Sequence, residues 1–324
     1  MAAGIGERRI FRGCGFPAVI SAGEDRNLGE RNESMDALAS TIVIQILHGL
    51  AYGMLLFLVS SGLTLVFGMM SVLNLAHASF YMLGAYFSYQ MLKWVGNFWI
   101  GLLVCPILVA GLGILMERFL LRRVHAGGHV QEFVLTAGIA FVVMETVKWI
   151  WGTEPLPVPI PALLSGSVNI IGNVYPAYRL FILFFSLVVL AFLAYILMKT
   201  RLGITVRAAV SDRDMVSALG TNTPFVFMLV MGIGTWLAGL AGVIAGPFIS
   251  TYPGMAGEIL VDCFVVTVTG GLGSLGGAVV ASFLIGQLSS FGILLIPRFA
   301  IVFAFLLMAV VLIIKPSGLF GEKG

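Results

Sequence analysis

The 324-residue chain carries a net charge of +3, with 59% hydrophobic and only 10% charged residues. Typical soluble domains contain about 25% charged residues, so this composition argues against a soluble domain. Three scattered cysteines argue against a disulfide framework or a zinc site. The apolar runs approach the roughly 20 residues that cross a bilayer as a helix, and they lack the alternation of barrel strands. We therefore predict an all-α polytopic membrane protein.

Residues 1–34 differ from the rest of the chain. They contain mixed charges and no apolar stretch long enough to span a membrane or to form the core of a signal peptide. Met35 stands just before the first hydrophobic run. We interpret 1–34 as either a disordered tail or a segment upstream of the true start at Met35, and 35–324 as the transmembrane domain.

Nine apolar runs follow, and some of them are short or interrupted. A proline-rich stretch, 152–177, predicts an extended loop between the fourth and fifth runs. Residues 68–78 and 270–277 are candidates for re-entrant segments, so we predict about eight or nine transmembrane helices with re-entrant or broken segments. The runs are 42–67, 79–92, 98–116, 133–151, 178–198, 225–246, 259–269, 278–295 and 299–314.

The placement of lysine and arginine predicts the two sides of the membrane. Cytoplasmic loops carry an excess of these residues, so three basic clusters and the C-terminus should be cytoplasmic and the proline-rich loop outside. The same count puts the N-terminus outside, although the arginines of 1–34 suit export poorly; a start at Met35 removes this conflict. The clusters are Arg118, Arg122 and Arg123; Lys199, Arg201, Arg207 and Arg213; and Lys315 and Lys323.

Residues 199–224 form the longest hydrophilic run in the second half of the chain. Alanines, valines and a methionine recur at helical spacing over 205–219, and Gly220 provides a stop signal. We predict a short amphipathic helix at the cytoplasmic face that contacts a soluble partner. The alternative is a solvated basic loop that only fixes the topology.

Asn74 and His77 stand among apolar residues at membrane depth. Polar groups are costly there and often functional, so one interpretation is that both line a translocation path. The other is that they hydrogen-bond locally and cap a broken helix. For His48, in the first run, we favour a packing role.

Residues 270–277 read GGLGSLGG, which contains a formal G-x-G-x-x-G. No βαβ unit surrounds this motif, so it does not indicate a dinucleotide site; we interpret it as bare backbone that approaches a neighbouring helix or a substrate. The triplet at 78–80 followed by Gly84 recurs at 281–283 followed by Gly286, as expected for two broken segments around a midplane site. Replacing Gly273 or Gly276 by leucine should then abolish transport without preventing membrane insertion. The predicted path residues are Asn74, His77, Gly84, Gly270, Gly271, Gly273 and Gly276.

Two further pairs of charged residues lie near the expected outer side. Glu145 and Lys148 are spaced to pair on one helix face. Glu258 and Asp262 precede or begin the seventh run, where they are either solvated or in contact with an extracytoplasmic protein.

Four stretches of the chain resemble a known family. Residues 62–89 (GLTLVFGMMSVLNLAHASFYMLGAYFSY), 203–248, 268–286 (VTGGLGSLGGAVVASFLIG) and 315–321 (KPSGLFG) are similar, in order and spacing, to the LivH-type permeases of branched-chain amino acid ABC transporters. The resemblance runs from about residue 45 onward, and 1–34 have no counterpart in it.

The resemblance implies an ABC importer permease fold in the bacterial inner membrane. It implies two ATPase subunits, a second related permease and an extracytoplasmic substrate-binding protein as partners, with membrane lipid around the chain and no cofactor or nucleic acid. The expected substrates are leucine, isoleucine and valine, or other hydrophobic amino acids, amides or urea. No G-x-x-x-x-G-K-[ST] motif occurs in the sequence, so ATP hydrolysis belongs to partner subunits and the chain is not itself an enzyme. The residues implied to form the helix that couples to the ATPase are Arg207, Ala208, Ala209, Asp212, Ala218 and Gly220.

Two other function classes stay open at the level of the residues. An ion-gradient-driven transporter or channel for a small solute such as an amide or urea would need buried carboxylates, and Glu145 and Asp262 both lie near the ends of runs. An intramembrane enzyme would need a nucleophile with its base, and His48 and His77 with scattered serines form no recognisable set.

Overall fold

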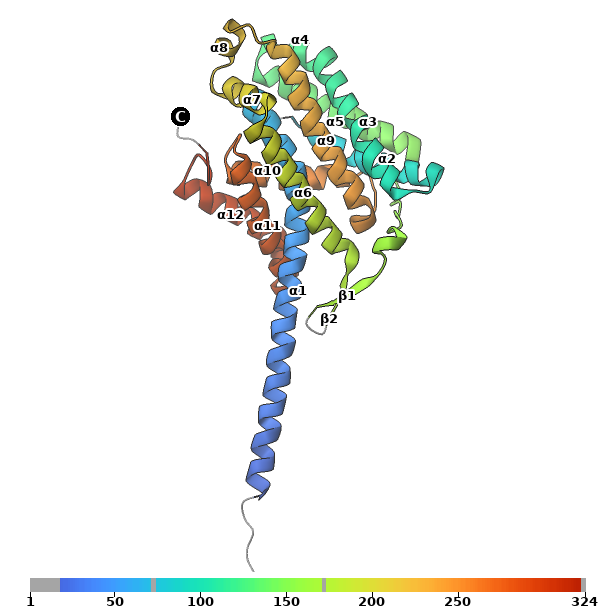
Figure 1. Ribbon diagram of the computed structural model, residues 1–324, viewed down its shortest axis with the longest axis vertical. Coiled ribbons are helices and arrows are strands. Elements are labelled where there is room, and N and C mark those ends of the chain that lie inside the picture. Colours follow the sequence, from blue (N-terminus) through green and yellow to red (C-terminus); the bar gives the residue numbers. More distant parts are fainter. Residues whose placement is uncertain (1–17, 71–73, 171–172, 322–324) are drawn as a thin grey trace, which may run out of the picture. The chain divides into compact units, whose positions relative to one another are not determined.

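The computed structural model describes residues 18–70, 74–170 and 173–321 (Figure 1). The chain divides into two compact units, 1–43 and 44–324. The described part of the first unit is helical, so 18–34 differ from the disordered tail that was one expectation for 1–34. Residues 1–17 lie outside the described part, and a start at Met35 stays a prediction.

The described residues are overwhelmingly α-helical, as the composition predicts. Six helices are long and apolar enough to cross a membrane: Leu38–Met70, Phe98–Val124, His129–Trp151, Ala177–Lys199, Thr223–Ile249 and Leu275–Leu295. Shorter or less apolar helices, among them α2, α10 and α12, bring the number close to the predicted eight or nine. The α-helices are α1 (Ala18–Met70), α2 (His77–Val95), α3 (Phe98–Met116), α4 (Arg122–Val124), α5 (His129–Trp151), α6 (Ala177–Lys199), α7 (Arg201–Ser211), α8 (Arg213–Ala218), α9 (Thr223–Ile249), α10 (Met255–Gly270), α11 (Leu275–Leu295) and α12 (Ala300–Ile314).

Helix α9 is the most buried of the six spans (Figure 1). It is apolar on all sides, as expected of a helix surrounded by others, and α2 and α3 pack along it. Glycines bring the backbones together: Gly84 of α2 abuts the carbonyl of Gly239, and Gly242 abuts the carbonyl of Tyr81. Small residues at helix contacts are typical of membrane bundles.

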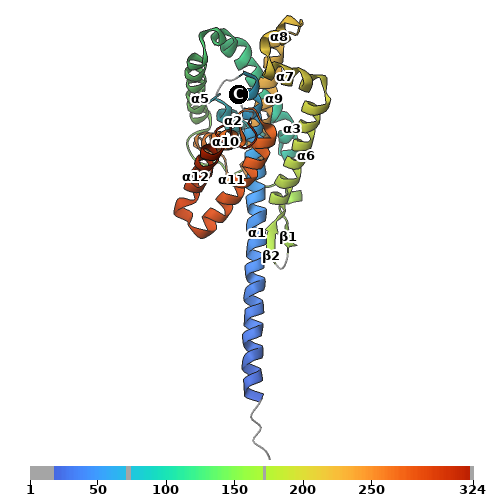
Figure 2. The ribbon, with the colours of Figure 1, turned by 90° about the vertical axis from the view of Figure 1, so that its left-hand side faces the viewer.

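Helices α10, α11 and α12 pack on one another as a second group (Figures 1 and 2). Residues 44–70 of α1 contact both groups. Gly53 lies against the carbonyl of Ser282 on α11, whereas Gly62, farther along α1, abuts the carbonyl of Gly234 on α9. One helix therefore connects the two groups.

Helices α5 and α6 present much of their apolar surface outward. Tyr178 donates a hydrogen bond of 2.7 Å to the carbonyl of Ile244 and so fastens α6 to α9. This outward surface suits lipid or another apolar partner. Its exposed residues include Phe141, Val142, Trp149, Phe184, Val188 and Phe192.

The proline-rich segment contains more regular structure than the extended loop that we expected. Strands β1 (Ser167–Ile170) and β2 (Asn173–Pro176) form an antiparallel hairpin. Leu156 pairs with Thr251 through backbone hydrogen bonds of 2.8 and 3.0 Å. The prediction missed both. For Leu156 and Thr251 the reason is that pairing partners distant in sequence leave no local pattern.

The predicted helix over 205–219 is wrong as a single element. Helix α7 ends at Ser211 and α8 begins at Arg213, with Asp212 in an extended conformation at φ −152°. Aspartate competes with helical backbone for hydrogen bonds and favours the N-cap. The side chain of Asp212 accepts a bond of 2.9 Å from the amide of Met215, so the second helix starts there.

Candidate functional site

Residues 199–224, called here the α7–α8 loop, have a backbone path that is set by glycine conformation and by hydrogen bonds of polar side chains. Gly220 has φ +84°, which only glycine adopts at low cost, and its amide donates to the carbonyl of Ser217 at 3.0 Å. Asn222 then caps α9, accepting a bond of 3.2 Å from the amide of Phe225. The loop therefore consists of two short helices, α7 and α8, followed by a turn at Gly220 that leads into α9.

The residues expected to couple the loop to a partner have different surroundings. Ala208, Asp212, Ala218 and Gly220 are exposed, while Ala209 is buried. Asp212 caps α8, and the Arg207 guanidinium donates to the carbonyl of Leu197 near the end of α6. A cation at a helix C-terminus is favourably placed.

Arg207 also lines a cavity of about 690 Å³, called here the Arg207 cavity. Its wall brings together segments far apart in sequence: the ends of α1 and α6, the middle of α7, the glycine segment 270–277 and the tail 315–321 after α12. The structure thus joins Arg207 and Gly273, which the sequence assigned to separate roles. Further lining residues are Thr64, Phe67, Gly68, Val206, Ser274 and Phe320.

Within 270–277 the glycines differ in what surrounds them. Gly273 has φ +82°, and a Cβ there would lie 3.0 Å from the Cα of Gly68. Gly270 and Gly277 abut each other's backbone across the α10–α11 turn. Gly276 is exposed with open space around it. The expectation that leucine is equally harmful at 273 and 276 therefore does not fit the geometry.

The tail after α12 completes this turn. Leu319 donates its amide to the carbonyl of Thr269 at 2.9 Å, and Phe320 donates to that of Gly270 at 3.0 Å. Gly318 and Gly271, both at positive φ, let the two segments approach. The tail thereby satisfies carbonyls at the end of α10 that lack helical partners.

Asn74 and His77 lie at the break between α1 and α2 and are both buried. Asn74 Oδ1 accepts from the amide of Ala76 at 3.0 Å. His77 Nε2 donates to the carbonyl of Val59 at 3.0 Å, since a carbonyl only accepts. Asn74 thus bonds locally at the break, whereas the His77 bond reaches back to α1. Neither residue lines the two large cavities described here.

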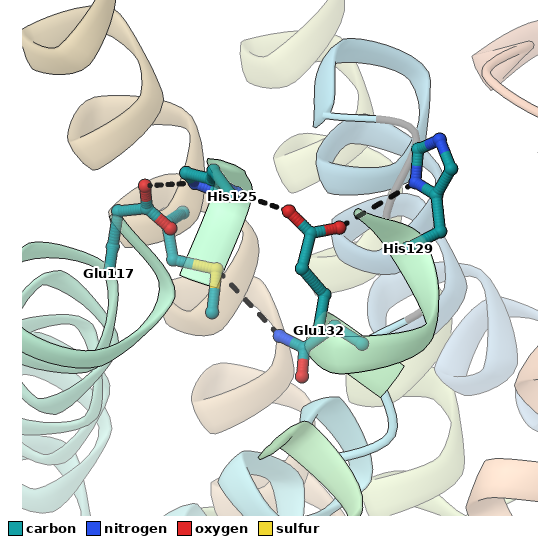
Figure 3. Close-up of polar contacts among 6 residues, drawn as sticks. Glu117, His125, His129 and Glu132 are labelled. Atoms are coloured by element: carbon teal, nitrogen blue, oxygen red, sulfur yellow. Dashed lines mark hydrogen bonds and ion pairs between the residues drawn. The ribbon is translucent and has the colours of Figure 1, made fainter. Parts of the chain in front are cut away.

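A buried polar cluster links α3 to α5 and was missed in the sequence (Figure 3). His125 lies between Glu117 and Glu132, with Nε2 3.0 Å from Glu117 Oε1 and Nδ1 bonded to Glu132 Oε1. His129 Nδ1 is 3.6 Å from Glu132 Oε2. A π-helical turn, Glu117–Leu121, turns the Glu117 side chain inward at the end of α3.

Two carboxylates flank the His125 ring and favour its protonated form. Hydrogen bonding to Glu117 and to Glu132 raises the pKa of His125 above its usual value, although burial opposes this. The ring also meets Phe227 edge-on at 5.9 Å, near the start of α9 and just beyond the α7–α8 loop. Because Glu117, His125 and Glu132 lie among arginines and glycines in the sequence, no local pattern predicts that they are buried.

A second cavity, of about 580 Å³, lies beside the middle of α1, along Gln45–Tyr52, and is called here the Arg179 cavity. Arg179, in the first turn of α6, and Asp262 of α10 both line it. Tyr52 Oη donates to Asp262 Oδ2 at 2.6 Å. The sequence prediction missed Arg179 and its meeting with Asp262, and it assigned His48, which also lines the cavity, to packing.

Comparisons with known proteins agree with the resemblance seen in the sequence. A family described as "Branched-chain amino acid transport system / permease component" matches residues 45–314. The chain is 28% identical to the high-affinity branched-chain amino acid transport system permease protein LivH of Salmonella typhimurium, over 86% of this chain and 95% of the relative. Identity is 28% to LivH of Escherichia coli K12 and 27% to BraD of Pseudomonas aeruginosa, with the same coverage. No solved structure matches.

Proposed function

Because the chain belongs to the family of permease components of branched-chain amino acid transport systems, we propose that it is the membrane-spanning subunit of an ATP-driven importer of branched-chain amino acids. The observation that carries this proposal is the continuous family match over 45–314, which covers helices α2 to α12, the Arg179 cavity and most of the wall of the Arg207 cavity. The ion-gradient alternative has no comparable support.

The proposal gives the α7–α8 loop the role of receiving force from ATP-hydrolysing partners. Its exposed alanines at 208 and 218 leave room for a partner surface to approach closely, and its caps make it stiff enough to transmit a push. Two ATPase subunits, a second related permease and an extracytoplasmic binding protein would complete the importer. The force would pass through α7 to the Arg207 cavity, where α1 and the glycine segment meet.

We propose that the residues predicted to line a translocation path act by shaping the helix breaks and the close helix contacts. Asn74 and His77 hold the α1–α2 break, while Gly270, Gly271 and Gly273 hold the α10–α11 break. Because glycine backbone forms these contacts, the helices can slide past each other without rearranging side chains. Gly84 allows the same close contact between α2 and α9, and Gly276 lies at the open side of the second break.

We orient the subunit in the bacterial inner membrane from its basic residues. Arg118, Arg122 and Arg123 lie at the α4 end, where Figure 1 also places α7 and α8, while the β1–β2 hairpin lies at the opposite end. The excess of arginine and lysine makes the α4 end cytoplasmic. The tail after α12 then lies in the cytoplasm, and the Arg179 cavity faces the outer side.

The test is purification of the tagged chain in gentle detergent from its own membranes, followed by mass spectrometry and ATP-dependent uptake of labelled leucine after reconstitution. ATPase chains should co-purify with the wild type. Gly220→Pro should lose them because proline requires negative φ. Gly220→Asn is the matched control, since asparagine tolerates the left-handed conformation. A chain that purifies alone and moves leucine without ATP would overturn the proposal.

A further inference from the structure

The Arg179 cavity contains two opposite charges that do not neutralise each other. Among the described residues, neither Arg179 nor Asp262 forms a salt bridge. Both side chains are partly buried and both line the same space. Charges removed from water without an opposite partner are costly, so this arrangement favours a ligand that carries both signs.

Other side chains hold the two charges in position. The Arg179 guanidinium lies 5.1 Å from the centre of the Phe248 ring, and Tyr175 of β2 lies nearby. The Tyr175 ring in turn stacks on His48 at 5.3 Å. On the other side, Tyr52 orients the Asp262 carboxylate. Fixed donors and acceptors reduce the entropy lost on binding.

The remaining wall is divided between polar and apolar residues. Gln45 and Ser290 bond each other's backbone between α1 and α11 and contribute polar atoms to the wall. The apolar part is formed by Phe248, Ile293, Leu294, Ala300 and Ala304. A volume of about 580 Å³ falls within the range of small-molecule sites, roughly 300–1,000 Å³.

We propose that the Arg179 cavity is a binding site for a free α-amino acid with an apolar side chain, in which Arg179 binds the α-carboxylate and Asp262 the α-ammonium group. The guanidinium fork matches a carboxylate in two parallel bonds, and a carboxylate accepts from an ammonium. The apolar wall receives the side chain. This inference rests on the proposed function and adds a specific substrate site within the membrane subunit, next to its outer side.

The experiment uses the complete complex purified from its own membranes, without the extracytoplasmic binding protein. Equilibrium binding of labelled L-leucine should be saturable for the wild type. Arg179→Gln and Asp262→Asn should each weaken it about tenfold or more, since each removes a hydrogen bond to a charged group. Arg179→Lys keeps the charge but loses the fork and should lie between Arg179→Gln and the wild type.

Matched controls separate the site from general charge effects. Arg298→Gln and Glu258→Gln change exposed residues close in sequence to the cavity wall and should leave leucine binding unchanged. Competition by 3-methylbutylamine, which lacks the carboxylate, tests the assignment of Arg179. The preference for leucine over this amine should fall at least about tenfold in Arg179→Gln. An unchanged preference, as a merely structural role would leave, contradicts the inference.

Failure of this inference is distinguishable from failure of the proposed function. If the wild-type complex drives ATP-dependent leucine uptake but shows no saturable binding, or if both site variants bind as the wild type does, the site is wrong and the function stands. If the wild-type complex shows neither uptake nor binding, both fall. Retained ATPase partners in each variant establish that the complex is intact.

Discussion

The two cavities, one beside the middle of α1 and one beside its C-terminal end, are built by different means. At the Arg207 cavity the arginine is satisfied by the Leu197 carbonyl, and glycine backbone forms much of the surrounding contact. At the Arg179 cavity the arginine and Asp262 remain without a salt-bridge partner among the described residues. Backbone contacts of this kind permit sliding, whereas held charges select a ligand. We propose that the subunit moves at the Arg207 cavity and recognises its substrate at the Arg179 cavity.

The largest expected effect comes from filling the backbone contact at the Arg207 cavity. Gly273→Leu should abolish ATP-driven leucine uptake, because a Cβ meets Gly68 and the positive φ disfavours any side chain. Uptake in vesicles and the amount of inserted protein would be measured together. Gly276→Leu is the matched control, with open space around it. Equal uptake by Gly273→Leu and Gly276→Leu would contradict the proposal that the contact between Gly273 and Gly68 slides during transport.

A smaller effect is expected from Arg207→Ala. The change frees the Leu197 carbonyl and loosens α7 from α6, so uptake should fall several-fold while ATP hydrolysis continues. The ratio of leucine moved to ATP hydrolysed is the measurement. Arg201→Ala removes an exposed cation from the same helix and serves as control. A ratio that falls equally in both variants would show that charge in the loop matters and not this bond.

The His125 cluster tests whether charged groups stabilise the fold near the end of α3 and the start of α5. The raised pKa of His125 means that folding favours its protonated form, so the stabilisation is present at low pH and is lost as pH rises through the raised value. The melting temperature in detergent should fall above about pH 6.5, the ordinary histidine pKa. Each kcal/mol lost corresponds to roughly 2–4 °C for domains of 150–250 residues.

The control for this pH dependence is His125→Gln, which should melt at a temperature that varies less with pH over the same range. Glu117, Glu132, His129 and the Phe227 ring are the groups that face His125. His129→Gln removes the exposed neighbour and should keep most of the dependence. A wild-type melting temperature that rises with pH would have the wrong sign.

The smallest effect is expected at the Glu145–Lys148 pair on α5. The pair forms as the spacing predicts, at 2.7 Å, but both side chains are largely or partly exposed. Exposed pairs contribute about 0–1 kcal/mol, so Glu145→Gln should change neither uptake nor melting temperature measurably. A clear loss of leucine uptake would extend the recognising region beyond the Arg179 cavity.

The sequence was informative wherever a property is local. Apolar runs predicted the spans because a helix that crosses a bilayer requires about 20 such residues. Gly220 marked the end of the loop helix because only glycine adopts its backbone conformation at low cost. The N-cap of α8 at Asp212 could also have been predicted from the sequence, since aspartate favours N-caps. The family resemblance, carried by four stretches, predicted the membership that the match over 45–314 establishes.

The sequence was uninformative wherever chemistry depends on packing. Arg179 and Asp262 stand on different helices far apart in the chain, and only the fold shows that they share a cavity. Glu117 lies beside basic residues and would be expected in solvent; a π-helical turn buries it. Gly273 and Gly276 are indistinguishable as letters, yet one touches a neighbouring backbone and the other touches nothing.

The tail after α12 has a consequence for how the protein is made. Residues 319 and 320 close the α10–α11 turn, but they leave the ribosome after helices α1 to α12 have been synthesised. The membrane helices can therefore insert before the turn receives its last hydrogen bonds, and this part of the fold matures after translation. Nascent subunits would carry an open turn that quality-control proteases can recognise, and shortening the tail before residue 319 should shorten the protein's lifetime in the cell.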